Sequence, residues 1–310
     1  MPSWPAAGDA RRLTPFDDDR ELPMDPFDSI DFRGQPALRL ATADGARAVI
    51  ALLGGQLLSW CPAGGSDWLF VSERASFDGS RAIRGGVPVC WPQFAAQGRL
   101  PRHGLLRTRR WTPTEQRGGK DFALATLRVE DDEASRAIWP FAFELELTVL
   151  IEGERLSIEL EASNTGHGAF AFTGALHTYL RVTEVERIRL EGLARHSYRD
   201  GTRDGERRID SGDHVRVEDH IDRIYTDVDG PLLLRDGSRS LAISAAGFTD
   251  VVVWNPWQQA AEELPDIAAG EFRRMLCVEA AVAGRAQELA AGESWVGRQT
   301  LVDLSLAARA

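Results

Sequence analysis

The clearest pattern in the chain is an alternation of apolar with mostly polar or small residues between positions 141 and 162. Apolar side chains occupy every second position of two runs: Phe141, Phe143, Leu145, Leu147, Val149 and Ile151, then Leu156, Ile158, Leu160 and Ala162. A polar turn at residues 152–155 separates the runs. Because successive side chains of a strand point to opposite faces, this pattern predicts a half-buried antiparallel hairpin.

Shorter apolar runs divided by turn residues extend this interpretation along the chain. They predict strands over residues 48–53, 56–60, 68–72 and 122–129, and again over 169–182, 188–193, 231–235, 239–246, 250–254, 272–282 and 295–305. A helical turn is expected only over residues 258–267. Many short strands at close spacing predict an all-β fold, a large antiparallel β-sandwich with few short helices.

The first 35 residues differ from the rest of the chain. They combine prolines with acidic clusters such as residues 17–19 and lack strand alternation. We interpret residues 1–35 as an acidic, proline-containing N-terminal tail. Nothing resembling a linker interrupts the strand pattern after it, so we expect residues 36–310 to form a single β-sandwich domain.

One internal segment, residues 81–111, breaks the strand pattern. It contains Gly85 and Gly86, three prolines, seven arginines and His103, the first histidine of the chain. Such punctuation predicts a long shaped loop, and loops of this length in compact domains tend to be functional.

Composition and charge remove several classes of partner. A net charge of -11 argues against nucleic acid, whose phosphates need a basic surface. Cys61, Cys90 and Cys277 lie far apart without CxxC spacing, so we expect no disulfide framework, no structural zinc site and a cytoplasmic location. The first residues lack a signal-peptide pattern, and no run reaches about 18 apolar residues, so we expect no membrane partner.

The common catalytic motifs are absent from the sequence. There is no P-loop, HExxH, GxSxG or GxGxxG pattern, and strands do not alternate with helices. Nucleotide-dependent transfer, zincin proteolysis and α/β-hydrolase chemistry are therefore unsupported.

Two predicted strands carry an ionisable residue among apolar neighbours. His177 lies within residues 175–180, and Glu279 lies within residues 275–280. An unpaired carboxylate is expensive to bury, so such groups often mark functional sites. A lone histidine on a strand is as readily explained as a hydrogen-bonded core residue. Each residue taken alone therefore leaves its role open.

Six segments in order give a more specific indication. They are IRGGVPVCWP (83–92), PRHGLLR (101–107), ALHTYL (175–180), DRIY (222–225), VVWNPW (252–257) and MLCVEAA (275–281). Over residues 35–305 the chain thereby resembles the glucose-6-phosphate 1-epimerase branch of the aldose 1-epimerase, or galactose mutarotase, superfamily. The resemblance implies a galactose mutarotase-like β-sandwich, no metal or cofactor, and interconversion of the α and β anomers of phosphorylated hexoses.

The resemblance also implies roles for individual residues. Glu279 would be the base and His177 the acid at the ring oxygen. The substrate-binding residues would be His103 and Asp222 for the sugar, Arg84 and Arg107 for the phosphate, and Trp91 or another nearby aromatic for the flat face of the ring. The sequence departs from the family at Gln93, where an aromatic residue is more usual, and at Leu105 and Leu106. These departures leave the shape of the sugar pocket open.

Three alternatives remain at this point. The chain could act on unphosphorylated aldoses, or bind a sugar phosphate without catalysis. It could also be a glycoside-processing enzyme that uses Asp222 with Glu279, since such enzymes need two carboxylates at the scissile bond. We expect a small sugar phosphate as the partner and a monomer or weak homodimer as the assembly.

Overall fold

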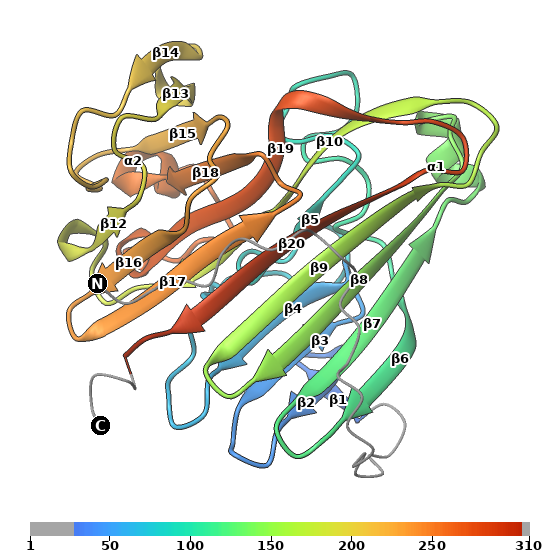
Figure 1. Ribbon diagram of the computed structural model, residues 1–310, viewed down its shortest axis with the longest axis horizontal. Coiled ribbons are helices and arrows are strands. Elements are labelled where there is room, and N and C mark those ends of the chain that lie inside the picture. Colours follow the sequence, from blue (N-terminus) through green and yellow to red (C-terminus); the bar gives the residue numbers. More distant parts are fainter. Residues whose placement is uncertain (1–27, 306–310) are drawn as a thin grey trace.

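The structure, a computed structural model, describes residues 28–305 and consists mainly of antiparallel β-sheet (Figure 1). The smallest sheet has four strands in sequence order: β1 (Ser29–Phe32), β2 (Gln35–Ala41), β3 (Arg47–Ala51) and β4 (Gln56–Cys61). The all-β prediction is confirmed. Within the described residues, no helix is long and apolar enough to cross a membrane.

Two larger sheets build the sandwich. The hairpin sheet has the spatial order β12 (Arg189–Glu191), β16 (Leu232–Asp236), β17 (Arg239–Ala246), β20 (Ser294–Asp303), β9 (Arg155–Asn164), β8 (Phe143–Glu152), β7 (Ala123–Glu130) and β6 (Thr112–Gly118). The site sheet has the order β14 (Glu206–Ile209), β13 (Ser197–Asp200), β15 (Ile221–Tyr225), β18 (Asp250–Asn255), β19 (Met275–Leu289), β10 (Phe170–Leu176) and β5 (Val89–Cys90), with β11 (Tyr179–Arg181) also paired to β19.

Helical segments are short and lie at the ends of the sheets. They are α1 (Glu133–Ile138), α2 (Trp257–Glu262) and the 3₁₀ turns η1 (Val185–Arg187), η2 (Gly201–Arg203) and η3 (Glu271–Arg274). A capping box begins α1, because the Asp132 carboxylate accepts from the Ser135 amide and the Ser135 hydroxyl accepts from the Asp132 amide. The helical turn expected at 258–267 is partly confirmed, because α2 ends at Glu262 and the rest of that range is loop.

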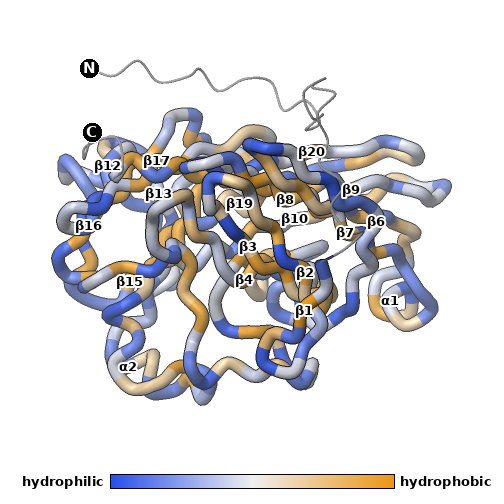
Figure 2. Tube along the Cα trace, turned by 90° about the horizontal axis from the view of Figure 1, so that it is seen from below, coloured by the Kyte–Doolittle hydropathy of each residue, from blue (hydrophilic) through white to orange (hydrophobic). Residues whose placement is uncertain are grey.

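The apolar faces of the two larger sheets meet in one core. Leu145 and Val149 of the hairpin sheet belong to the same buried cluster as Leu176 and Val278 of the site sheet. In Figure 2, hydrophobic positions accordingly concentrate in the interior around β3, β4, β8 and β10.

Strand β19 separates this core from the functional face of the site sheet. Val278 and Ala280 point into the core, whereas Ala281 belongs to a separate cluster on the opposite side of the strand. Since side chains alternate along a strand, Cys277 and Glu279 share the face of Ala281. The carboxyl group of Glu279 is thereby directed away from the sandwich core.

The strand predictions succeed where burial imposes alternation. The expected hairpin is β8–β9, in which Leu147 lies opposite Leu160. The strands expected at 239–246 and 250–254 are β17 and β18. Residues 68–72 form only isolated bridges, through Leu69 and Val71. Edge strands such as β6 and β14 escaped prediction because exposure removes the apolar signal.

Of two expectations about segments, the boundary of the N-terminal tail differs from the structure and the long loop is confirmed. Strand β1 lies inside the expected N-terminal tail, so the β-structure begins by residue 29. Residues 1–27 of that tail lie outside the described residues. The long loop expected over residues 81–111 is confirmed, and it is held in place because β5 pairs with β10 and isolated bridges form at Gly85, Val87 and Gly104.

The paired glycines of this segment serve the fold. Both have positive φ, 115° at Gly85 and 61° at Gly86. A Cβ atom would lie 2.3 Å from the Phe70 carbonyl oxygen at Gly85, and 2.2 Å from the Leu57 carbonyl oxygen at Gly86. Only glycine fits both the backbone conformation and the approach of these neighbours.

Trp91 lies in the core and not in a binding site. It is fully buried and its ring contacts Phe143 at 4.7 Å, Trp139 at 5.0 Å and Phe172 at 5.8 Å between centroids. The proposed sugar-facing role of Trp91 is therefore wrong. An aromatic residue in a glycine- and proline-rich segment gives no sign of which way it points.

Replacing Trp91 tests this assignment. We expect Trp91→Ala to lower the free energy of unfolding by about 3–5 kcal/mol, the usual scale for removing a buried tryptophan. Urea denaturation followed by circular dichroism measures it, with Ile138→Ala as the control because Ile138 is 53% exposed. A Trp91→Ala protein with normal stability but reduced ligand affinity would show that Trp91 binds the ligand after all.

Candidate active site

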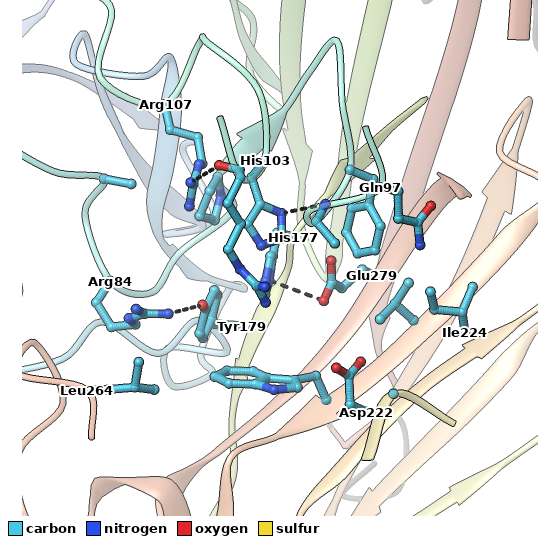
Figure 3. Close-up of a pocket in the computed structure, with 18 of the residues that line it drawn as sticks. Arg84, Gln97, His103, Arg107, His177, Tyr179, Asp222, Ile224, Leu264 and Glu279 are labelled. Carbon is cyan, nitrogen blue, oxygen red and sulfur yellow. Dashed lines mark hydrogen bonds and ion pairs between the residues drawn. The ribbon is translucent and has the colours of Figure 1, made fainter. Parts of the chain in front are cut away.

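A cavity of about 540 Å³ opens on the functional face of the site sheet (Figure 3). Its volume lies within the usual range for small-molecule sites. Six of the seven residues proposed from the sequence line it: Arg84, His103, Arg107, His177, Asp222 and Glu279. Trp91 is not among the lining residues.

Strand register explains why residues distant in sequence converge here. Asp222 of β15 lies opposite Trp254 of β18. Trp254 in turn lies opposite Cys277 of β19, and Cys277 lies opposite Tyr179 of β11. Glu279 is two positions farther along β19 and shares this face. Tyr179, Asp222, Trp254 and Glu279 on these four strands therefore line the floor of the cavity, whereas Cys277 is buried in a cluster with Phe70 and Met275 and does not line it.

His177 occupies the break between β10 and β11. Its backbone amide donates to the Pro88 carbonyl at 3.0 Å, so the segment 81–111 fixes its position. The imidazole stacks on the Tyr179 ring, with centroids 4.8 Å apart and planes 9° from parallel. The His177 Nδ1 atom lies 3.3 Å from Oε1 of Glu279, although the pair is not aligned as a hydrogen bond.

Burial controls the charge of both members of this pair. Glu279 is 1% exposed, and its Oε2 atom has no hydrogen-bond partner. Burial, reinforced by the nearby Asp222 carboxylate, raises the pKa of Glu279 well above its usual value. Burial and the positive field of neighbouring groups lower the pKa of His177 well below its usual value. The two groups together therefore favour holding one proton.

His103 is a neutral imidazole beside this pair. Its Nδ1 atom accepts a 3.3 Å hydrogen bond from the Ala95 amide, so its proton belongs on Nε2. Burial lowers the pKa of His103 to about 2. The ring centroid lies 5.3 Å from that of His177. His103 is thus a fixed hydrogen-bond donor and not a second titrating group.

Arginine side chains give part of the wall a positive charge. The five that line the cavity are Arg81, Arg84, Arg102, Arg107 and Arg199. Arg84 donates from Nη1 to the Tyr179 hydroxyl at 2.9 Å and lies 3.1 Å from Asp266 through Nη2. Although burial acts to lower the pKa of Arg84, Tyr179 and Asp266 raise it, and the group stays charged. Arg107 donates to the Arg102 carbonyl at 2.7 Å.

Asp222 lies on strand β15 and completes the polar floor of the cavity. Burial raises its pKa. Gly201 packs directly against it, and a Cβ atom there would lie 2.6 Å from Asp222 Oδ2. The absence of a side chain at Gly201 therefore allows Asp222 its position.

Among the lining residues that were not foreseen as site residues, Tyr179, Trp254 and Asp266 each contact a foreseen one. Tyr179 follows His177 at a spacing of two, so strand periodicity could have placed both on one face. Trp254 is half-buried, with its ring edge-on to His177, and it is the aromatic that the site offers in place of Trp91. Asp266 lies on an irregular segment and carried no sequence signal.

The departures from the family pattern lie outside the cavity wall. Gln93 is buried, donates to the Ala95 and Leu100 carbonyls and accepts from the Leu100 amide. It stabilises the turn that leads to His103. Leu106 is buried in the sandwich core, and Leu105 packs against that core. None of these three side chains lines the cavity.

One group of side chains within the described residues is close enough to share a metal ion. The ligand atoms of His177, Cys277 and Glu279 all lie within 4.8 Å of one another. Cys277 packs with Phe70 and Met275, and burial raises the pKa of its thiol well above the usual value. Because metals bind thiolates, this environment is a poor ligand set, and we assign no metal to it.

Relatives of known classification resemble the chain over most of its length. A protein from Cenchrus ciliaris provisionally named glucose-6-phosphate 1-epimerase is 35% identical over 264 residues, which cover 82% of this chain and 80% of the relative. A protein of the same provisional name from Escherichia coli (strain K12) is 33% identical over 247 residues, covering 78% and 82%.

The structural comparison agrees. The crystal structure of YeaD from Salmonella typhimurium, provisionally named a mutarotase, has a TM-score of 0.83 and 28% identity, and the match covers 91% of this chain and 95% of that one. The galactose mutarotase-like fold expected from the sequence is confirmed. Residues 36–301 match the sequence model of the family described as aldose 1-epimerase. The chain therefore belongs to the aldose 1-epimerase family and is an isomerase.

Proposed function

We propose that this protein interconverts the α and β anomers of a hexose 6-phosphate, with glucose 6-phosphate as the first substrate to test. The carrying observation is the buried Glu279–His177 pair on the floor of a cavity whose wall bears arginines. The provisional names of its relatives support the same substrate.

Anomer exchange requires two coordinated proton transfers. A base removes the proton from the C1 hydroxyl while an acid protonates the ring oxygen, so the bond between C1 and the ring oxygen breaks and a C1 carbonyl forms. Rotation about C1–C2 then presents the other carbonyl face. Ring closure reverses both transfers, and no proton, electron or group is gained or lost.

A carboxyl–imidazole pair that holds one proton suits this sequence. Ring opening uses the Glu279 carboxylate as base and protonated His177 as acid, and leaves protonated Glu279 with neutral His177. Both members of the pair are then individually neutral, which is the state that burial favours, so the reactive ion pair forms when the same single proton moves from Glu279 to His177. The 3.3 Å separation allows the proton to return between the groups.

The remaining wall supplies recognition. Arginine offers planar, bidentate donors to phosphate, and we assign Arg84 and Arg107 to this task. His103 and Asp222 would hydrogen-bond the sugar, and Trp254 would present a flat face to its ring.

The positive wall favours a phosphorylated over a free sugar in a chain whose overall charge is -11. The cysteines Cys61, Cys90 and Cys277 are free and buried, which fits a cytoplasmic location.

Anomer exchange of freshly dissolved α-glucose 6-phosphate, followed by NMR, tests the activity. We expect Glu279→Gln and His177→Ala to slow catalysed exchange by about a hundredfold or more, the scale of an acid–base group. Glu288→Gln is the matched control, because Glu288 lies exposed on the same strand. Exchange no faster than buffer with the unmodified protein would rule out the function, and variants with normal rates would rule out the roles.

Substrate choice is tested at the arginines. We expect Arg84→Gln and Arg107→Gln each to raise the KM for glucose 6-phosphate by about tenfold or more, because each removes a charge-assisted hydrogen bond. The KM for glucose should change much less. Arg285→Gln serves as the control, since Arg285 is exposed on β19. Equal effects on both sugars would instead favour a mutarotase for unphosphorylated aldoses.

The pH dependence of kcat reports the protonation state of the Glu279–His177 pair. Because the pKa of His177 is lowered, the pair gains a second proton only well below pH 6.5. Because the pKa of Glu279 is raised, the pair loses its single proton only well above pH 4.5. We therefore expect the acid limb of kcat, measured at saturating substrate, to lie well below pH 6.5. An acid limb centred on the ordinary histidine value would contradict the one-proton pair.

A further inference from the structure

The guanidinium of Arg84 is held at two of its three nitrogens. Its Nη1 donates to the Tyr179 hydroxyl at 2.9 Å, and its Nη2 lies 3.1 Å from Asp266 Oδ1. A guanidinium has five N–H bonds in one plane, so one hydrogen bond to Tyr179 and one ion pair with Asp266 together fix the direction of that plane. The side chain is 22% exposed and lines the cavity, and because its Nε atom is buried without a partner, the remaining Nη N–H bonds are the ones available to a ligand.

Asp266 is fixed in turn by the segment that carries it. Neighbouring Ile267 is buried with Ala261 and Phe272. The Glu271 carboxylate accepts from the Ala268 amide at 2.7 Å and from the Ser72 hydroxyl at 2.5 Å. The Ser72 amide donates to the Arg84 carbonyl at 3.0 Å. The segments bearing Asp266 and Arg84 are thus tied together near the ion pair.

Tyr179 contacts both the proposed phosphate-binding residue Arg84 and the proposed acid His177. Its hydroxyl accepts from Arg84, and its ring stacks on His177 with centroids 4.8 Å apart. Tyr179 is 2% exposed and is paired with Cys277 across β11 and β19, so it has little freedom to turn. Figure 3 shows it between Arg84 and His177.

We propose that Tyr179 and Asp266 are positioning residues that orient Arg84 toward a phosphate, and that Tyr179 couples this arginine to His177. The proposal rests on the function proposed above. The hydroxyl of Tyr179 acts on Arg84 and sets phosphate affinity. The ring acts on His177 and sets the rate of proton transfer. One residue therefore has two separable effects.

Two substitutions of Tyr179 separate these effects. Tyr179→Phe keeps the stacked ring and removes the acceptor for Arg84. We expect it to raise the KM for glucose 6-phosphate and the inhibition constant of inorganic phosphate by roughly tenfold, the scale of one hydrogen bond to a charged group, with little change in kcat. Tyr179→Leu also removes the stack, so we expect kcat to fall as well, with glucose 6-phosphate and with glucose.

Asp266 is tested by a conservative pair. Asp266→Ala removes the second acceptor and should weaken phosphate affinity by roughly tenfold. Asp266→Asn retains an oxygen for Nη2 and should preserve most of that affinity. A purely structural role would lower stability without this rescue pattern. Tighter phosphate binding in both variants would mean that Asp266 competes with the ligand as a counter-charge, and would overturn the positioning role.

Tyr225→Phe is the matched control. Tyr225 lies on β15 of the same sheet and also has a buried hydroxyl, which donates to Asp210 at 2.8 Å. Its removal should leave the phosphate inhibition constant unchanged. Urea midpoints for all variants identify losses caused by unfolding.

The outcomes distinguish this proposal from the proposed function. Calorimetry with inorganic phosphate measures the binding without relying on catalysis. Unmodified protein that binds phosphate but catalyses no exchange would refute the function alone. Catalysed exchange together with unchanged phosphate affinity in Tyr179→Phe and Asp266→Ala would refute the positioning roles alone. Failure of the unmodified protein to bind phosphate would overturn this proposal also.

Discussion

Burial of the Glu279 carboxyl beside the His177 imidazole is the constraint on which the site depends. Charged groups are disfavoured at 1% exposure, so the pair is most stable when a single proton leaves both members neutral. The site sheet places Glu279 on the face away from the sandwich core, where His177 and Asp222 lie near its carboxyl group. The catalytic proposal follows from where that proton sits, and the surrounding arginines then determine which sugar the cavity favours.

The sequence was informative where burial leaves a periodic trace. Alternation placed the β8–β9 hairpin, and a single acid in the apolar run 275–280 marked Glu279. The resemblance of ordered segments placed Arg84, Arg107, His103 and Asp222 at one cavity. Their convergence is a property of strand register, which links residues far apart in sequence and leaves no local signal.

The failures have equally physical causes. Trp91 was assigned to the sugar because the direction of a side chain in irregular backbone cannot be deduced from composition, and it points into the core. The reason for glycine at positions 85 and 86 is also invisible in the sequence, because the groups that approach them are the distant Phe70 and Leu57 carbonyls. Asp266 was overlooked because its importance arises only from the arginine that lies beside it in space.

The two faces of β19 also bear on how this family can diversify. Val278 and Ala280 belong to the sandwich core, whereas Cys277 and Glu279 belong to the opposite face. On the face away from the core, Glu279 lines the cavity, whereas Cys277 and Ala281 pack among buried neighbours. Diversification on this strand is therefore limited by packing on both of its faces. A single-residue insertion in this strand would exchange the two sets and abolish both.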